Sequence, residues 1–309
     1  MIVRPDVSVI IPTRDAIAWL PSAIASIGMD RHIEIIVVDD GSTDGTLCWL
    51  GKQATVDDRL RFLHGTRAGF SRARNLGISA ATAPLIAFLN FDDRWLPGKL
   101  DMQLALHAAH PEIGFSFAMC RRAAGSEQES GECFKAWRRF AGGYAGTGQS
   151  VVIEHPVAAL YAQNIVSVST VVARTDLLQA VGGFRTEPVS AEDWDLWLRM
   201  AARAPVGVVP AVLAEEMTSH AATLKAHAGL RVAAMHIIAE RYSELAIRDD
   251  PAAHEVFMTR LLTARAAAAC ASGQHLSAAM LQLRALLREP SWRGVTQTCT
   301  ALLPSASRI

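Results

Sequence analysis

The stretch IEIIVVDD, residues 33–40, decides the fold class. Its Ile and Val side chains fill both faces of a strand, which is typical of a strand buried in a parallel sheet. The polar sequence GSTDGT follows at 41–46, and a helical pattern continues to about residue 54. Strand, turn and helix in this order predict a βα unit, whose strand ends in two carboxylates, Asp39 and Asp40.

The segments on either side repeat this unit. VSVIIP at 7–12 predicts a strand before the helical stretch WLPSAIASIG, and LRFLHG at 60–65 predicts a third, shorter strand. A helix over GFSRARNLGISAAT and a fourth strand over PLIAFLN, residues 84–90, complete the series. The inner face of that helix is expected to consist of Ala73, Leu76 and Ala80. This alternation predicts right-handed crossovers and a mostly parallel α/β sheet flanked by helices.

Composition excludes several classes of protein. The 309 residues are 50% hydrophobic and 19% charged, which is typical of a globular protein, and the formal net charge of +0 gives no support for nucleic acid as a partner. The N-terminus lacks a signal peptide pattern, and no segment approaches the ~20 apolar residues of a membrane span. The odd number of scattered cysteines predicts reduced thiols and a cytoplasmic location. They are Cys48, Cys120, Cys133, Cys270 and Cys299.

Two predicted strands end in paired carboxylates, Asp39-Asp40 and Asp92-Asp93. Ligands of parallel sheets bind beyond the carboxyl ends of the strands, and these pairs are expected on one edge. A single acidic strand end is common in ordinary turns, but two on one edge favour a metal or polar-ligand site. The sequence has no Gly-x-Gly-x-x-Gly or Gly-Lys-Ser/Thr loop, so a bound diphosphate would need a hard cation and Arg.

Five motifs together resemble a known family. They are VSVIIPTRD, IEIIVVDDGSTDGT, GFSRARNLGISAA, LIAFLNFDD and AEDWDLWLRM, between about Pro5 and His220. Their order and spacing are similar to those of the inverting family-two glycosyltransferases, which are nucleotide-sugar enzymes of the GT-A fold. The resemblance implies a GT-A glycosyltransferase catalytic domain over residues 1–222. It also implies inverting transfer of a sugar from a nucleotide-diphosphate donor, with a UDP-sugar favoured, to an acceptor hydroxyl.

The resemblance also assigns the donor site. It implies that the first loop packs under the nucleoside, that Asp39 reads the base, and that Asp40 follows towards the ribose. A carboxylate can accept from the N3–H of uracil, which suits an acid at this position. Asp15, also in the first loop, is an equally good candidate for a helix N-cap. The implied donor-binding residues are Pro12, Thr13, Asp39, Asp40, Arg74 and Asn90, whereas Arg72 is expected to be solvated.

FLNFDD, residues 88–93, matches the Asp-x-Asp-Asp stretch of the family, with Asn90 at its first position. The family's first carboxylate mostly contacts the ribose, and an amide oxygen at that position can accept a hydrogen bond from a ribose hydroxyl. Asp92 keeps the implied metal-ligand role, with Asp93 beside it, and His220 matches a late His that reaches the metal or diphosphate. Mn²⁺ or Mg²⁺ suits such carboxylates. For His220, a structural or surface position is an equally good alternative.

The segment AEDWDLWLRM predicts an apolar helix with two acids at its start. Acids at a helix N-terminus are favoured by the helix dipole alone, and this is sufficient to explain Glu192. For Asp193 the resemblance implies the role of catalytic base. The two alternatives are a catalytically silent sugar-nucleotide-binding module, favoured by Asn90, and a nucleotidyltransferase, which usually carries a Gly-rich basic first loop.

The remaining regions are less specific. Residues Cys120 to Val151 are polar and rich in Gly and Arg, and the resemblance places a carbohydrate or lipid-linked acceptor there. Within them KAWRRF is compatible with peripheral contact at the inner face of a membrane, although a solvated basic turn is the simpler reading. Residues 223–309 predict a C-terminal helical appendage or dimer contact. Its tetratricopeptide-like spacing, in a single repeat that cannot form a solenoid, is carried by Gly273, Ala278, Ala285 and Pro290.

Overall fold

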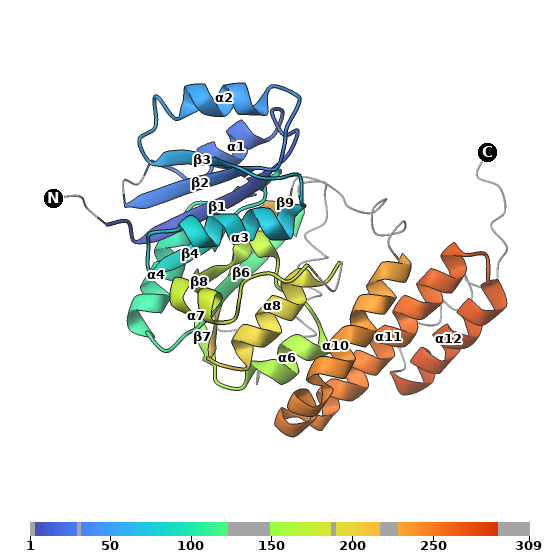
Figure 1. Cartoon of the computed structure of the whole chain (residues 1–309). Coiled ribbons are helices and arrows are strands. Elements are labelled where there is room, and N and C mark those ends of the chain that lie inside the picture. Colours follow the sequence, from blue (N-terminus) through green and yellow to red (C-terminus); the bar gives the residue numbers. More distant parts are fainter. Residues whose placement is uncertain (1–3, 30–31, 123–148, 187–189, 217–227, 290–309) are drawn as a thin grey trace. The chain divides into compact units, whose positions relative to one another are not determined.

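In the computed structural model, the first four strands are parallel and lie side by side in the order β3-β2-β1-β4 (Figure 1). These strands are β1 (Val7–Thr13), β2 (Ile33–Asp39), β3 (Leu60–His64) and β4 (Leu85–Phe88). The helices that connect them are α1 (Leu20–Ala25), α2 (Thr46–Gln53) and α3 (Phe70–Ala80). The strand order and the alternation with helices confirm the predicted parallel α/β half.

The structure describes residues 4–29, 32–122, 149–186, 190–216 and 228–289. Beyond β4 the nine-stranded sheet becomes mixed, because β8 pairs antiparallel with β4 and with β6, while β6 and β9 are parallel. The strands of this half are β5 (Asp93–Trp95), β6 (Phe115–Arg122), β7 (Val151–Ile153), β8 (Val172–Arg174) and β9 (Val206–Glu216). The helical elements between them are α4 (Lys99–Ala109), η2 (Val168–Thr170), α7 (Thr175–Ala180) and α8 (Glu192–Ala201).

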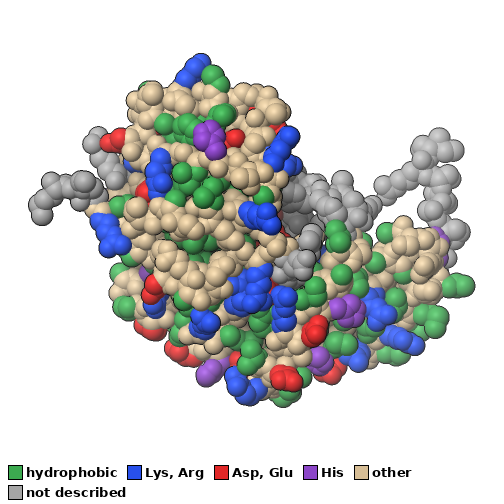
Figure 2. Space-filling model, in the orientation of Figure 1, with side chains coloured by type: hydrophobic (Ala, Val, Ile, Leu, Met, Phe, Trp, Pro, Cys, Tyr) green, Lys and Arg blue, Asp and Glu red, His purple; other side chains and the backbone are tan. Residues whose placement is uncertain are grey.

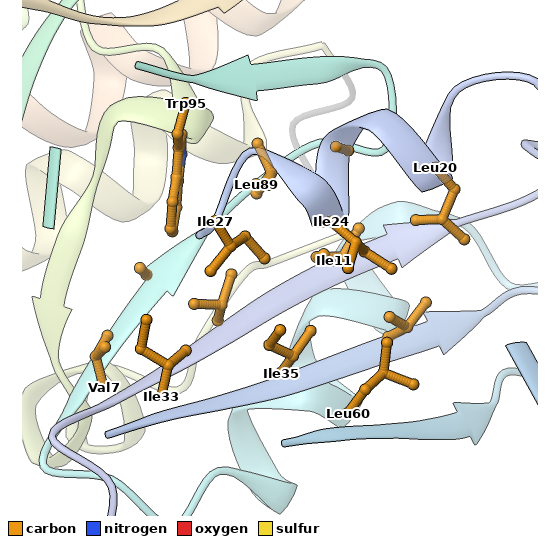
Figure 3. Packing of buried hydrophobic residues seen from close by; sticks show 14 of the residues in the cluster. Val7, Ile11, Leu20, Ile24, Ile27, Ile33, Ile35, Leu60, Leu89 and Trp95 are labelled. Atoms are coloured by element: carbon orange, nitrogen blue, oxygen red, sulfur yellow. The ribbon is translucent and has the colours of Figure 1, made fainter. Parts of the chain in front are cut away.

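Alternate residues of the buried strands face different helices. The side chains of Ile33 and Ile35 point to the face covered by α1, where Leu20 and Ile24 pack against them (Figure 3). Val37 belongs to the same cluster. Ile36 and Val38 point to the other face and pack against Ala73 of α3. Both faces are thus apolar, which explains why β2 reads as a continuous apolar run.

The buried face of α3 differs from the prediction. Leu76 is 39% exposed, whereas Gly77 and Ile78 are buried beside Ala73. Residues 73, 77 and 80 form the inner stripe, because Gly77 has no side chain and lets the helix approach Ile10 of β1 closely. The prediction that Leu76 faces inward was therefore wrong, while Arg72 is exposed as expected.

The chain divides into two compact units. The larger comprises Met1–Pro156, Ile165–Thr186 and Asp193–Ser219, and contains the sheet. The smaller comprises Val157–Asn164, Glu187–Glu192 and His220–Ile309. The predicted domain boundary near residue 222 lies outside the described residues, and stays a prediction.

The smaller unit contains most of α6 (Pro156–Ala162) and all of α10 (Ala228–Asp249), α11 (Pro251–Ala271) and α12 (His275–Arg288), so the predicted C-terminal helical region is confirmed. Tyr161 of α6 stacks on Phe257 of α11, with ring centroids 4.3 Å apart. Arg260 also donates to Gln163 Oε1 at 2.9 Å. These contacts join a short segment from mid-chain to the C-terminal helices.

The surface mixes side chains of both charges. On the face shown in Figure 2, basic and acidic side chains are interspersed with hydrophobic ones, in keeping with the formal net charge of +0. In the part of the chain that the structure describes, none of the helices combines the length and apolar character needed to cross a bilayer.

Candidate active site

The ends of β1, β2 and β4 bring several of the predicted site residues to one edge of the sheet. Thr13 and Asp39 are register partners at the ends of β1 and β2, and the Asp40 amide donates to the Thr13 carbonyl at 2.8 Å. On the other side of β1, the Leu89 amide donates to the Ile10 carbonyl at 3.1 Å, just before Asn90. Nucleotides bind at such an edge in parallel α/β sheets.

Asp39 is buried, and its carboxylate stabilises the turn that follows β2. Its Oδ1 accepts from the Ser42 hydroxyl, and its Oδ2 accepts from the Ser42 amide at 3.2 Å. Beside it, Thr13 is also buried, and its hydroxyl oxygen has no hydrogen-bond partner within the described residues. Pro12, the residue before, lies inside β1 opposite Val38. Each carboxylate oxygen of Asp39 keeps a second lone-pair direction, so it can still accept from a ligand.

Asp40 anchors the loop that precedes α3. Its Oδ1 accepts from the Ala68 amide at 3.0 Å, and its Oδ2 accepts from the Gly69 amide at 2.8 Å. Only 1% of Asp40 is exposed. This carboxylate therefore positions the start of the helix that carries Arg74, and the two adjacent acids have different neighbours.

Asp15 joins two loops and does not cap a helix. Its Oδ1 accepts from the Thr43 amide at 2.6 Å, and its own amide donates to the Ser42 hydroxyl at 2.9 Å. The N-cap residue of α1 is Trp19, so the helix-cap alternative for Asp15 was wrong. The contacts of Asp15 hold the first loop against the turn that follows β2.

Asn90 bridges an arginine and a buried carboxylate. Arg74 Nη2 donates to Asn90 Oδ1 at 3.1 Å, and Asn90 Nδ2 donates to Asp93 Oδ2 at 3.0 Å. The Arg74 guanidinium also lies over the Phe184 ring, 5.1 Å from its centroid. The structure thus brings Arg74, Asn90 and Asp93 into one hydrogen-bonded chain.

Asp93 is the most perturbed carboxyl of this site. Its pKa is raised from 3.8 to about 7, chiefly by burial and to a smaller extent by the nearby carboxylates of Asp92 and Glu216. Hydrogen bonds from the Ser169 hydroxyl, at 2.5 Å, and from Asn90 oppose the shift. The buried Asp93 carboxyl therefore interacts with two other acidic side chains as well as with its two hydrogen-bond donors.

Asp92 is more accessible than Asp93, since it is half-buried at the turn between β4 and β5. Within the described ranges, no group of three or more His, Cys, Asp or Glu side chains is arranged to hold a metal. The residues still fit a hard divalent cation, because such an ion needs only one or two carboxylates beside phosphate oxygens. Asp92 and Glu216 lie close enough to Asp93 to contribute to the rise in its pKa, and this nearness of three acidic groups supports the fit. His220 lies outside the described residues.

Asp193 lies in the first turn of α8, where it is half-buried and accepts from the Trp194 amide at 2.7 Å. Two residues further along, Asp195 is completely buried and pairs with Arg199 at 2.8 Å. The side chains of Trp197 and Leu198 enter the core, as the apolar pattern predicts. The helix that presents Asp193 is thus fixed along its inner face.

Three neighbours of the site were missed in the sequence. Ser42 carries a usable signal, because it follows Asp39 by three residues in a turn sequence. Ser169 and Phe184 carry none, because each is distant in sequence from its partner: Ser169 is 76 residues from Asp93. The acceptor segment predicted between Cys120 and Val151, with KAWRRF, lies mostly outside the described residues.

Comparison with known proteins identifies the family to which the chain is similar. Residues 8–167 match the model of the family described as Glycosyl transferase family 2. The putative teichuronic acid biosynthesis glycosyltransferase TuaG of Bacillus subtilis is 36% identical over 105 residues, which is 33% of this chain and 41% of that protein. Two other relatives, an uncharacterized glycosyltransferase of Rickettsia felis and the uncharacterized protein MT1568 of Mycobacterium tuberculosis, are matched over 16% and 65% of their own lengths.

Solved structures with the same fold cover nearly all of the chain. Staphylococcus aureus TarS (residues 1–349) in complex with UDP-GlcNAc has a TM-score of 0.62 at 15% identity, covering 96% of this chain and 89% of that one. The mannosyltransferase PcManGT of Pyrobaculum calidifontis, in complex with GDP-Man and Mn²⁺, has a TM-score of 0.63 at 22% identity, covering 96% and 84%. These likenesses establish the fold, and the GT-A-type arrangement expected from the sequence is confirmed.

Proposed function

The chain belongs to glycosyl transferase family 2, and on this premise we propose that it is an inverting glycosyltransferase that takes its sugar from a nucleoside diphosphate. The observation that carries the proposal is the sharing of one sheet edge by Asp39 and by the Arg74–Asn90–Asp93 chain. These groups offer a carboxylate that can accept from a base, a guanidinium that can bind phosphate, and an acidic side chain near a possible cation. Together they suit a nucleoside diphosphate bound with a cation.

Asp39 is the better candidate for reading the base. Both oxygens of Asp40 already accept from the backbone of residues 68 and 69, whereas the partners of Asp39 all belong to Ser42. A carboxylate can accept from uracil N3–H, and a UDP-sugar is therefore favoured. The UDP-GlcNAc bound by TarS supports this choice, and the GDP-Man bound by PcManGT makes guanosine diphosphate the main competitor.

A divalent cation, Mn²⁺ or Mg²⁺, would be held by Asp92, with Asp93 behind it and His220 as a further candidate ligand. When bound, it would offset the negative charge of the diphosphate as this group leaves. Arg74 would contribute to the same task, because its guanidinium lies at the donor edge and is held by Asn90. The Mn²⁺ in the PcManGT complex supports this assignment.

Asp193 is proposed as the base. Its carboxylate would remove the acceptor hydroxyl proton while the acceptor oxygen bonds to the anomeric carbon. In the same step the bond from that carbon to the diphosphate oxygen breaks, and the electron pair leaves with the nucleoside diphosphate. A carboxylate at a helix N-terminus is favoured in its ionised form, and the buried inner face of α8 keeps it in place. Attack opposite the leaving group inverts the configuration.

The acceptor is proposed to be a carbohydrate or a lipid-linked carbohydrate. TuaG, whose name places it in teichuronic acid biosynthesis, supports a role in making a polysaccharide or glycoconjugate. A lipid-linked acceptor would be held in a membrane, so peripheral contact of the enzyme with the membrane surface is compatible with this acceptor class.

The test combines ligand binding with transfer. Thermal unfolding is measured with UDP, GDP, dTDP and ADP, with and without Mn²⁺, and a ligand at a hundredfold excess over its Kd should add about 2.7 kcal/mol of stability. UDP with Mn²⁺ is expected to give the largest shift, and Asp92→Asn should remove the part that depends on metal. Equal shifts with and without Mn²⁺ would contradict the metal assignment, and a response to GDP alone would change the donor.

Transfer is then measured with the donor selected by binding. Asp193→Asn keeps the shape of the side chain and removes the base, so turnover should fall by about 10²–10⁴-fold. Nucleotide affinity should stay unchanged, and Glu192→Gln serves as the matched control with near-normal turnover. Normal transfer by Asp193→Asn would mean that the base is another residue.

A second candidate is a sugar-nucleotide-binding module without transfer activity. Asn90, in place of the carboxylate typical of the family, is the observation that favours it. The same experiment separates the two, because the module would bind UDP and Mn²⁺ but would transfer no sugar to any acceptor tested.

A further inference from the structure

Asn75 of α3 holds the backbone of Phe184, 109 residues further along the chain. The Phe184 amide donates to Asn75 Oδ1 at 2.8 Å, and Asn75 Nδ2 donates to the Phe184 carbonyl at 2.7 Å. One planar amide thus satisfies both backbone groups of one residue, which a hydroxyl or carboxylate cannot do with the same geometry.

The backbone fits tightly around this amide. Gly183 has a φ of +62°, and a Cβ at that position would lie 2.4 Å from Asn75 Oδ1. A side chain at 183 would therefore both strain the backbone and displace Asn75. The backbone conformation at residues 183–184 and the position of Asn75 therefore depend on each other.

Helix α8 holds the same segment through Arg199. Arg199 donates to the carbonyls of Val181, at 2.6 Å, and Gly183, at 2.7 Å, while its Nε pairs with the buried Asp195. Residues 181–184 are therefore bonded to both α3 and α8. Asp193 lies in the same first turn of α8, two residues before Asp195.

The Phe184 ring makes a second connection between the same helices. Its centroid lies 5.1 Å from the Arg74 guanidinium carbon on α3 and 6.1 Å from the Trp197 ring on α8. It also meets Phe88 of β4 edge to face at 5.4 Å. A shift of Phe184 would therefore alter the distance between Arg74 at the donor edge and the helix that bears Asp193.

We propose that Asn75 is a positioning residue, which sets the placement of Asp193 relative to the donor site through Phe184. The inference rests on the proposed transfer reaction, because it gives Asn75 a role only in aligning base and donor. Misalignment of reacting groups by about 1 Å can cost ~10²-fold in rate, even when the mutation lies far from the reacting atoms. Asn75 itself contacts neither donor nor acceptor in this scheme.

The first measurement is the split between turnover and binding. Asn75→Leu removes both hydrogen bonds, and it should lower kcat by at least about tenfold while the Kd for UDP changes less than about threefold. Ser79→Ala, on the exposed face of the same helix, should leave both unchanged. An equal loss of kcat and of UDP affinity would overturn the inference, as would a normal kcat.

A double-mutant cycle provides the second measurement. If Asn75 acts only through Asp193, then Asn75→Leu combined with Asp193→Asn should turn over no more slowly than Asp193→Asn alone. If the loss of kcat in the double variant equalled the product of the two single losses, the inference would be overturned. Should Asn75→Leu not fold, Phe184→Leu replaces it in the same cycle, because it keeps the backbone bonds and removes the ring. Absence of transfer by the wild-type protein would count against the proposed function itself.

Discussion

Asn90 donates its side-chain amide to the buried carboxylate of Asp93, with 3.0 Å between Nδ2 and Oδ2. The other end of the same amide accepts from Arg74. An aspartate at position 90 could still accept from Arg74, but it would place a second carboxylate oxygen against Asp93. The amide is thus a neutral link between a cation and a carboxylate, which gives the departure from the family pattern a physical reason.

Asn90→Asp should therefore make the metal-free protein less stable. Above pH 7, where Asp93 is ionised, an Asp93 oxygen would lose its donor and face a like charge, which should cost about 1–3 kcal/mol. Added Mn²⁺ should recover more stability in Asn90→Asp than in the wild type, because the extra carboxylate gives the cation more negative charge. Thermal unfolding in EDTA and in Mn²⁺ measures both effects, with the exposed Gln179→Glu as the control for added charge. If Asn90→Asp were as stable as the wild type in EDTA, the hydrogen bond from the Asn90 amide to Asp93 would not contribute to stability.

Asp93 should also give the metal-free protein an unusual pH dependence. Burial raises its folded-state pKa to about 7 from an ordinary 3.8, so the folded protein binds this proton more tightly than the unfolded chain. Stability from this group is therefore present in acid and is lost as the pH rises from about 4 to 7, by up to ~1.4 kcal/mol per pH unit.

His107 acts in the opposite direction. Burial lowers its folded-state pKa to about 4 from 6.5, so its stability contribution is lost as the pH falls from 6.5 towards 4. The two slopes oppose each other over that range. In urea unfolding with EDTA, Asp93→Asn should therefore lose stability in acid more steeply than the wild type. His107→Gln should become less stable as the pH rises towards 7, and parallel profiles for all three proteins would contradict both assignments.

The parts of the site that depend on local pattern were predictable, and those that depend on distant contacts were not. The strand before Asp39 is visible because Ile and Val fill both its faces, and parallel strands bring their carboxyl ends to one edge. Leu76 was misplaced because the sequence pattern treats Gly77 as neutral, whereas close packing on Ile10 turns that glycine inward. Ser169 could not be foreseen, since its contact with Asp93 depends on how the segment before β8 lies beside β4 and β5.

Asp39 and Asp40 should separate into a binding residue and a folding residue. In Asp40→Asn, the amide nitrogen would face the N–H of Ala68 or Gly69, and the loss of one acceptor should cost about 1–3 kcal/mol of unfolding free energy. In Asp39→Asn the Ser42 hydroxyl can rotate to accept, so stability should fall less while UDP affinity falls at least about tenfold. Urea unfolding and calorimetry measure the two quantities. Equal losses of affinity in the two variants would refute the separation.

Gly77→Ala should disturb the packing that places α3 against the sheet. A Cβ at position 77 would lie 2.5 Å from Ile10 Cγ2, so α3 would have to move away from β1. Overpacking of this kind costs about 1–3 kcal/mol, which exceeds the gain of up to ~1 kcal/mol from replacing a helical glycine. Gly51→Ala is the matched control, because Gly51 is also helical but has open space around it, and should stabilise the protein by about 0.5–1 kcal/mol.

The direction of this steric effect can be tested by removing the residue that Gly77 approaches. Ile10→Ala creates room, so Gly77→Ala should destabilise an Ile10→Ala background much less than it destabilises the wild type. Because α3 also carries Arg74, the single Gly77→Ala variant should bind UDP more weakly, and the double variant should recover part of that affinity. Urea unfolding of the four proteins in the cycle gives the coupling energy, and calorimetry gives the affinities. Strictly additive unfolding free energies would mean that the contact between Gly77 and Ile10 does not set the position of α3.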